Sequence, residues 1–431
     1  MWDFETDPEY QRKLDWVEEF MRDELEPLDH APLDPYDKKN PRLMAVLRPL
    51  QQKVKDQGLW AAHLSPDLGG QGYGQVQLAL LNEIVGRSRW APAVFGSQAP
   101  DSGNAEILAL FGTEEQKQRY LQPLLDGEIS SCYSMTEPQG GSDPGLFTTS
   151  AVPDGDDWVI NGEKWFSSNA RYASFFIVMA VTNPDARTHQ KMSLFIVPAE
   201  TPGIEIVRNV GVGGESSAHA SHGYVRYTDV RVPSDHVLGG EGQAFAIAQT
   251  RLGGGRVHHA MRTIALARRA FDMMCERAVS RQTRQGPLGD FQMTQEKIAD
   301  SWIEIEQFRL LVLRTAWKID KYHDYQKVRR DIAAVKVAMP KVLHDVVLRA
   351  MQVHGSLGVS DEMPFVKMLV ASQSLAIADG PTEVHKLTVA RRTLREYEPV
   401  DTLFPSGHLP TRKEAARARL AELLELEIAE L

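Results

Sequence analysis

The sequence predicts an α+β protein in which a small β domain lies between two helical regions. Apolar residues recur at helical spacing up to about residue 125 and again over residues 243–396. Over about residues 129–238 the pattern changes to alternation and to β-branched or aromatic runs. We therefore expect an N-terminal helical domain (1–128), a central small β-barrel or sandwich domain (129–240), a C-terminal four-helix bundle (241–398) and an extension with one helix (399–431).

The N-terminal region has the apolar spacing of several helices, of which Leu14, Val17 and Leu25 are an example. A loop over residues 66–74 interrupts this pattern and contains four glycines. Because no strand is predicted before it, we interpret this loop as a connector and not as a phosphate cradle.

In the central region, the run Trp158–Phe166 has Asn161-Gly162 near its middle, which favours a β-hairpin turn at that point. Residues 174–180 and 194–197 have the continuous apolar character of buried strands. Residues 223–227 and 230–233 predict the last two strands of this domain.

Long helices are expected in the third region, over residues 256–281, 292–321 and 331–353. Their lengths suit a helix bundle. Residues 412–431 are rich in Ala, Glu, Arg and Leu and predict an amphipathic helix, which we expect to dock on its own chain or on a neighbour.

Composition and charge argue against several classes of function. The 431 residues include 48 basic and 58 acidic side chains, so a net charge of −10 is spread along the chain and disfavours binding to nucleic acid. Cys132 and Cys275 are too few for a disulfide framework or a zinc cluster, and we expect no metal site. No apolar run approaches the length of a membrane span and the first residues lack a signal core, so we expect a cytoplasmic protein without an integral membrane segment.

The stretch Asp379-Gly380-Pro381 lies between an apolar run and a helical pattern, and it allows two interpretations. Asp379 can be the N-cap of the following helix, with Pro381 in the first turn. Alternatively, Asp379 is a catalytic base that the positive end of the helix keeps ionised. The two roles are compatible.

Two segments resemble motifs of the acyl-CoA dehydrogenase family. Residues 132–143 are similar to its TEPxxGSD segment, and residues 161–169 to its NGxKxWITN segment. The resemblance implies an FAD site in which Phe166 and Ser168 stand for the usual Trp and Thr. It further implies that Tyr133, Met135, Thr136 and Gly141 line the flavin, and that Ser142 lies toward the flavin phosphate or CoA. Without the resemblance, the first segment would be a glycine-rich turn between strands.

Further positions of the bundle match the family in order and spacing. Arg281 resembles the arginine that reaches the pyrophosphate of the flavin in a neighbouring subunit, which implies a homodimer or homotetramer. An arginine fork suits phosphate. The other matched flavin positions are Thr283, Gln292, Gln352, Gly355, Thr382 and Glu383. Taken singly, each of these polar residues would be assigned to a solvated helix face.

The family places its base at one of two sequence positions. One directly precedes the arginine of Gly255-Arg256, where Gly255 has no side chain, and the other corresponds to Asp379. The resemblance therefore implies that Asp379 removes the α proton of an acyl-CoA while the β hydride passes to flavin N5, which gives the trans-2-enoyl-CoA. An electron-transfer flavoprotein is the electron acceptor that this reaction implies.

The segments 97–104, 253–262 and 378–381 resemble one branch of the family, which includes the dehydrogenase part of kinase-fused proteins linked to 4-hydroxyacyl-CoA breakdown through a phosphorylated intermediate. We expect Gly255, Arg256 and Gly380 beside the acyl chain. His258, His259 and Arg262 can meet an oxygenated or anionic substituent, such as a 4-phosphoryloxy group. Alternatively, the histidine pair is satisfied by its neighbours.

Two other classes remain open from the sequence. A flavin enzyme of the same fold can use oxygen, as an oxidase or monooxygenase, and relatives that resemble nitroalkane oxidase also have aspartate at the base position. The remaining alternative is a non-catalytic acyl-CoA-binding homologue, which would bind flavin that is never reduced.

Overall fold

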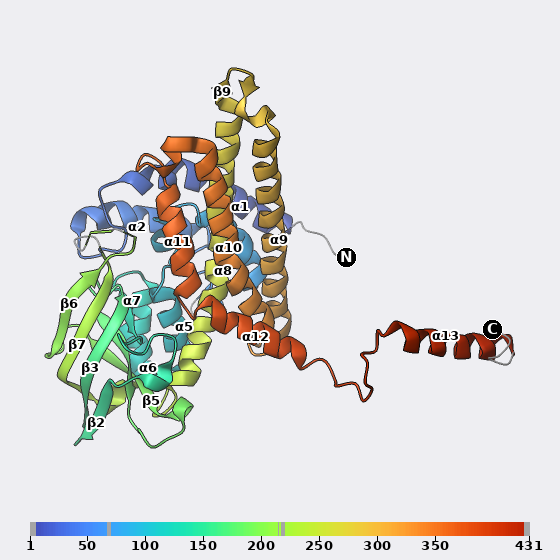
Figure 1. Cartoon of the computed structure of the whole chain (residues 1–431). Helices are drawn as coiled ribbons and strands as arrows, with labels where there is room; N and C mark the ends of the chain where they lie inside the picture. The colour runs from blue at the N-terminus through green and yellow to red at the C-terminus, as the bar shows by residue number, and fades with distance from the viewer. Residues whose placement is uncertain (1–5, 67–69, 214, 217–219, 426–431) are drawn as a thin grey trace.

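The computed structural model describes residues 6–66, 70–213, 215–216 and 220–425, and the predicted order of helices, strands and helices is confirmed (Figure 1). The longer N-terminal helices are α1 (Pro8–Phe20), α2 (Pro41–Asp56), α3 (Gly74–Val85) and α5 (Asp101–Phe111). Side-chain caps begin the first two, because Asp7 accepts from the Tyr10 N–H and Asn40 from the Arg42 N–H. Short helices α4 (Ala91–Val94), α6 (Glu114–Gln116) and α7 (Gln122–Leu125) complete this region.

The central region is one sheet with the strand order β6-β7-β3-β2-β4-β5-β8, and β1 pairs in parallel with β4. Its strands are β1 (Ser131–Ser134), β2 (Ser150–Asp154), β3 (Asp157–Ser168), β4 (Phe175–Val181), β5 (Met192–Pro198), β6 (Ile204–Val210), β7 (His222–Pro233) and β8 (Val237–Leu238). Strand β4 is buried almost throughout, as its apolar run predicts.

The hairpin expected at Asn161-Gly162 is wrong, because β3 continues through both residues. The β2–β3 turn lies earlier, between Asp154 and Asp157. Gly162 instead lies at an irregularity in the pairing of β3 with β7, with φ +147°, and a Cβ there would stand 2.5 Å from the Thr149 hydroxyl oxygen. Glycine is therefore required by close approach of the Thr149 backbone and side chain. The two strands predicted over 223–233 are likewise one strand, β7.

The C-terminal bundle is built from α8 (Ala244–Ser280), α9 (Gln292–Tyr322), α10 (Arg329–His354) and α11 (Phe365–Ile377), followed by α12 (Thr382–Leu394). Helix α8 begins twelve residues before the expected start at Arg256, and it includes the glycines 253–255. Gly253 and Gly254 are buried against Tyr325 and Glu106, so tertiary packing outweighs their weak helix propensity. Strands β9 (Gln282–Thr283) and β10 (Gly286–Pro287) form the tip of an arm between α8 and α9 (Figure 1).

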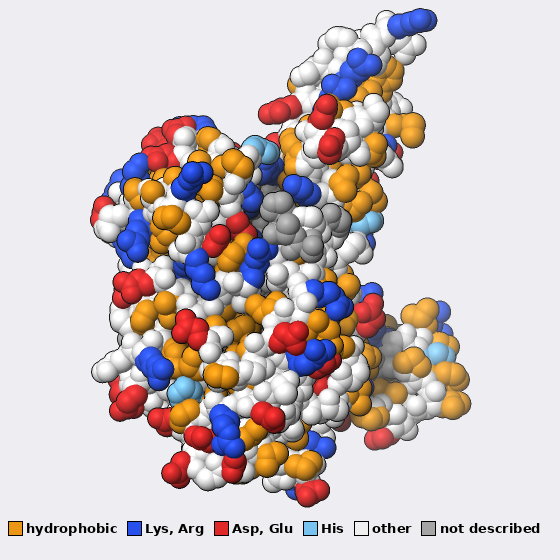
Figure 2. Space-filling model, turned by 90° about the vertical axis from the view of Figure 1, so that its left-hand side faces the viewer, with side chains coloured by type: hydrophobic (Ala, Val, Ile, Leu, Met, Phe, Trp, Pro, Cys, Tyr) orange, Lys and Arg blue, Asp and Glu red, His pale blue; other side chains and the backbone are white. Residues whose placement is uncertain are grey.

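The last described helix, α13 (Leu409–Leu424), extends away from the body of the molecule on a linker (Figure 1). It does not dock on its own chain, which leaves the neighbour alternative, and residues 426–431 of the predicted helix lie outside the described residues. Within the described ranges, no helix is both long and apolar enough to cross a membrane. The same ranges contain no cluster of three or more His, Cys, Asp or Glu residues suited to a metal ion. On the face shown in Figure 2, basic and acidic side chains are interspersed.

Candidate active site

Asp379 lies in the short turn between α11 and α12. It is not the N-cap of α12, because that position belongs to Pro381 and no side chain caps the helix there. Asp379 and Gly380 both have positive φ, +55° and +101°. A positive φ is uncommon for an aspartate, and such conformations are frequent at functional sites.

Side chains from two other elements hold this turn by the carbonyl of Asp379. The Arg256 Nε donates to it at 2.9 Å, and the His385 Nε2 lies 3.2 Å from the same oxygen. Burial, assisted by the Arg256 charge, lowers the pKa of His385 to about 4, so this ring is neutral at pH 7 and Nε2 carries the donated proton. The sequence analysis expected Arg256 beside the acyl chain and assigned no role to His385, which is buried in the first turns of α12.

The two base positions of the family meet at one point in space. A Cβ added to Gly255 would stand 3.6 Å from Oδ2 of Asp379. His259, one turn further along α8, places Nε2 3.8 Å from the same oxygen. Burial lowers the pKa of His259 to about 4 despite the attraction of Asp379, so this histidine is neutral at pH 7. The Asp379 carboxylate therefore faces the open site left by Gly255.

Two residues of α8 near His259, namely His258 and Arg262, also carry buried polar atoms. Within the described residues, His258 Nε2 and Arg262 Nε are buried without a hydrogen-bond partner, although Arg262 Nη2 donates to the Ser97 carbonyl at 3.2 Å. Burial lowers the pKa of His258 well below its usual value, and its ring packs edge-on against His63 with 6.2 Å between centroids. An unpaired buried polar group costs about 1–3 kcal/mol, so these nitrogens are available to pair with a bound molecule or a water.

The first two family motifs lie side by side in the sheet region. The Trp165 N–H donates to the Thr136 carbonyl at 2.8 Å, which joins the two segments. Phe166 has φ +54° and a ring that is 41% exposed although it stacks on His222 with 4.8 Å between centroids. Ser168 Oγ lies 2.9 Å from Nδ1 of the same histidine. Sequence reasoning missed His222, because nothing in its local sequence relates it to residue 166.

These segments have free space and free polar atoms that suit an FAD. The Tyr133 hydroxyl is buried without a partner among the described residues, and Arg251 lies over its ring at 3.9 Å. A Cβ at Gly141 would meet nothing within 4 Å, and the neighbouring Ser142 is exposed. The exposed face of Phe166 can pack against a planar ring. The residues present therefore fit the cofactor that the resemblance implies.

A buried ion pair that the sequence analysis did not single out fixes the two motifs. Lys164 donates to Glu137 Oε1 and to the Met135 carbonyl, both at 2.8 Å, and both charged groups are almost completely buried. Burial opposes ionisation of Glu137, but the Lys164 charge and hydrogen bonds from Lys164, Thr148 and Thr149 outweigh it and lower the pKa of Glu137 to about 2.

The remaining predicted flavin residues fall into two groups. Thr382 and Glu383 begin α12 beside the Asp379 turn, where Thr382 Oγ1 donates to the Ala376 carbonyl at 3.2 Å. Arg281, Thr283, Gln292, Gln352 and Gly355 lie at the far end of the bundle near the β9 arm (Figure 1). At 1.5 Å per residue, the 25 residues of α8 from Gly255 to Ser280 span about 38 Å. One chain therefore does not bring these five residues to its own Asp379 site.

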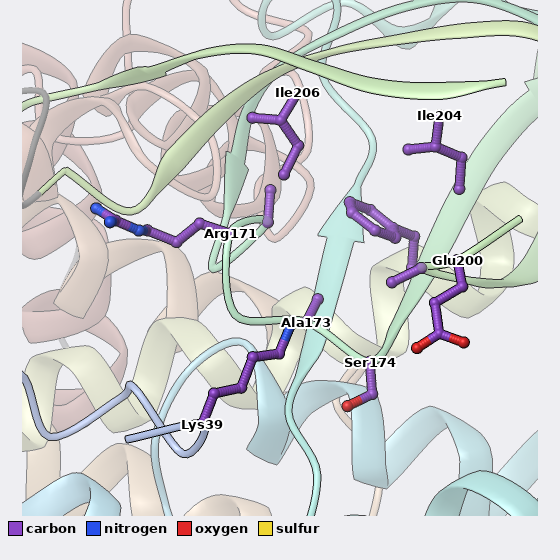
Figure 3. A pocket seen from close by; sticks show the side chains of 10 residues that line it. Lys39, Arg171, Ala173, Ser174, Glu200, Ile204 and Ile206 are labelled. Atoms are coloured by element: carbon purple, nitrogen blue, oxygen red, sulfur yellow. The ribbon is translucent and has the colours of Figure 1, made fainter. Parts of the chain in front are cut away.

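A separate surface cavity of about 330 Å³ lies where the segment around Lys39 meets the edge of the sheet (Figure 3). Arg171, Ser174, Glu200, Ile204 and Ile206 line it together with Lys39. None of the predicted site residues borders this cavity.

The fold and the site together define a flavin-dependent oxidoreductase of the helical–β–helical type. Three family models cover most of the chain: the N-terminal, middle and C-terminal domains of acyl-CoA dehydrogenase match residues 7–128, 132–230 and 242–394. The chain belongs to the acyl-CoA dehydrogenase family. It is thus an oxidoreductase acting on acyl-CoA.

Known proteins support this assignment. The chain is 44% identical over 353 residues to the "Probable acyl-CoA dehydrogenase FadE2" of Mycobacterium tuberculosis, covering 81% of this chain and 86% of that protein. It is 40% identical over 388 residues to acyl-CoA dehydrogenase family member 11 of Gallus gallus, covering 87% of this chain but only 49% of the relative. It therefore spans about half the length of that relative.

Solved structures agree with the fold. A structure from Mycobacterium abscessus described as an acyl-CoA dehydrogenase superimposes with a TM-score of 0.85 at 38% identity, over 92% of this chain and 100% of that one. The FAD complex of PigA, at 24% identity, shares the fold with a TM-score of 0.77 over 92% of this chain and 100% of that one. FAD is the cofactor of this family, to which the three matched domains assign the chain.

Proposed function

We propose that this protein converts an acyl-CoA to the trans-2-enoyl-CoA with Asp379 as the base that removes the α proton. The observation that carries the proposal is the position of Asp379 Oδ2 opposite the empty Gly255 site, 3.6 Å from where a side chain there would begin. Of the two family base positions, residue 255 has no side chain, so Asp379 is the acidic residue that remains. FAD, when bound, accepts the β hydride of the acyl chain.

The turn also supplies a donor for the thioester carbonyl. Among the described residues, the backbone N–H of Asp379 has no hydrogen-bond acceptor, while its own carbonyl is held by Arg256 and His385. A fixed N–H stabilises the negative charge that develops on the carbonyl oxygen as the α proton leaves. Aspartate is one methylene shorter than the glutamate usual in the family. We expect the left-handed turn at Asp379 and Gly380 to bring the shorter carboxylate to the α carbon.

Residues of the described chain can hold FAD in the way the family motifs imply. Phe166 offers an aromatic face, and Tyr133 and Thr136 offer hydroxyls. Arg281 and Gln352 of the distant group are the candidates for the phosphates of an FAD held by a second copy. We infer a homodimer at least, because Arg281 lies about 38 Å along α8 from Gly255, which faces the Asp379 site of the same chain.

The acyl chain that fits best carries a polar substituent. His258 and Arg262 lie four residues apart on α8, on either side of His259 in the sequence, and each has a buried nitrogen without a partner among the described residues. An oxygen or phosphoryl substituent near C4 of the acyl chain would hydrogen-bond to these nitrogens. A plain alkyl chain would leave them unpaired, at a cost of about 1–3 kcal/mol each. The substrate class we propose is therefore a 4-oxygenated or 4-phosphoryloxy acyl-CoA. An electron-transfer flavoprotein is the proposed acceptor of the electrons.

The test is anaerobic. The purified yellow protein is mixed with plain, 4-hydroxy and 4-phosphoryloxy acyl-CoA thioesters, and the flavin absorbance is followed. Rapid bleaching with 4-substituted thioesters, at least tenfold faster than with plain ones, is the expected result. Equal rates with all thioesters would remove the proposed substrate class. No bleaching with any thioester, with turnover of other substrates in air, would instead favour an oxidase or monooxygenase.

The polar substituent is tested by one variant and a matched control. Arg262→Met should remove the preference for the 4-phosphoryloxy substrate and leave the plain substrate unaffected or improved. Arg268→Met is the control, because Arg268 lies on the same helix, is partly exposed and pairs with Glu306 away from the site. Loss of the preference in the control as well would contradict the assignment to Arg262.

A further inference from the structure

Lys336 is a buried cation close to the Asp379 turn. It belongs to none of the segments or positions that resemble the family motifs. It lies in the first third of α10 and is only 2% exposed. Its Nζ donates to the carbonyl of Leu375, in the last turn of α11 and four residues before Asp379. The partner of this ammonium is therefore a carbonyl at a helix C-terminus, where the helix dipole favours a positive charge.

Charged and titratable groups from three elements face Lys336. Asp379 attracts its ammonium from the turn, and Arg256 on α8 opposes it. The Lys336 charge in turn opposes protonation of His259 on α8 and of His385 on α12. Asp379 is thus the one negative group among those whose charges act on Lys336, and the interaction between them favours both charged forms.

We propose that Lys336 is a positioning residue for the base: its ammonium holds the end of α11 that carries the Asp379 turn, and it places a positive charge near that turn. The inference rests on the proposed role of Asp379. It assigns to Lys336 no contact with substrate or flavin. Arg256 on α8 also holds this turn, through the backbone carbonyl of Asp379.

The protonation states agree with this role. Burial lowers the pKa of Lys336 to about 8, although Asp379 opposes the shift. The ammonium is therefore present throughout the acidic and neutral range in which a carboxylate titrates. Removing a positive charge near a carboxylate favours its protonated form, so we expect the acid limb of the kcat/KM profile, which reports the free enzyme's base, to move to higher pH.

The experiment measures kcat/KM against pH for the FAD-loaded full chain and for three variants. Lys336→Gln keeps a hydrogen-bond donor without the charge, and we expect its acid limb to move up by about half to one pH unit. Lys336→Arg keeps the charge and should retain the limb of the parent. Lys341→Met is the matched control, because Lys341 lies on the same helix with a side chain that is 72% exposed.

An unshifted acid limb in Lys336→Gln, with reduced thermal stability or flavin content, would overturn the inference and leave Lys336 a structural residue. If Lys336→Gln fails to fold, a shifted limb in Lys336→Arg would equally contradict it, because that variant keeps the charge. Asp379→Asn distinguishes this failure from that of the proposed function. An active Asp379→Asn variant would show that Asp379 is not the base. An inactive Asp379→Asn variant, together with an unshifted acid limb in Lys336→Gln, would contradict only the inference about Lys336.

Discussion

We expect that the proposed base can be moved from residue 379 in the turn to residue 255 on α8, because side chains at these two positions reach the same place. We predict that Gly255→Glu partly restores the activity lost in Asp379→Ala. The Cβ of the new glutamate would start 3.6 Å from the present Oδ2 position, and two further bonds of about 1.5 Å bring its carboxylate to that place. General-base catalysis contributes about 10²–10⁴-fold. We expect Asp379→Ala to lose about 10³-fold and the double variant to regain about 10- to 100-fold.

The assay is the rate of anaerobic flavin reduction by a saturating acyl-CoA. Gly255→Glu alone should be slower than the parent at neutral pH, because two adjacent carboxylates raise each other's pKa and one remains protonated. Thr250→Glu in the Asp379→Ala background is the control, because five residues along α8 turn its side chain by about 140° from that of residue 255. A double variant that folds, binds FAD and acyl-CoA, and is no faster than Asp379→Ala would refute the shared position of the two bases.

Other parts of the site give further predictions. Glu137→Gln should cost about 3–5 kcal/mol in the free energy of unfolding, because it removes the negative partner of the buried Lys164 ammonium; urea unfolding that differs little from the parent would contradict this. Because the folded pKa of Glu137 is about 2 and lies below its unfolded value, its stabilisation is present above the unfolded pKa and is lost as pH falls toward 2; acid unfolding of the parent, but not of Glu137→Gln, should show this loss. Gly380→Ala should slow flavin reduction at least tenfold, because φ is +101° and a Cβ would stand 2.9 Å from His385 Nε2; an unchanged rate would contradict the role of the turn. Arg281→Met should lower FAD retention without affecting acyl-CoA preference, and dialysis followed by absorbance at equal protein concentration measures it; full retention would argue against FAD contacts from a second copy.

Much of the fold was predictable because each region has its own period. Helical spacing before and after an alternating segment reflects which faces are buried, and the structure has helices and strands in that order. The turn with Asp379 was also located from local signals, namely a small residue, Gly380 and Pro381 between two helical patterns. The backbone conformation of the turn was not predictable, because an aspartate that caps a helix and an aspartate with positive φ have the same local sequence.

The errors and omissions have physical reasons. Asn161-Gly162 is a common turn pair, but here Gly162 is required by the approach of Thr149 from a neighbouring segment. The contacts of His222 with Phe166, and of Lys336 with Leu375, join residues 56 and 39 positions apart, respectively. Neither contact has a periodic or motif signal, because long-range pairing depends on how the elements pack.

The central claim is that Asp379 takes the α proton. The most direct test compares the parent with Asp379→Asn in anaerobic stopped-flow mixing with a 4-oxygenated acyl-CoA, after equal FAD content and equal ligand binding have been verified. The asparagine keeps the size and the backbone of the turn but accepts no proton at neutral pH. We expect acyl-CoA to bind while the flavin stays oxidised, at a reduction rate at least 10²-fold below that of the parent. Reduction at the rate of the parent would show that another group removes the proton.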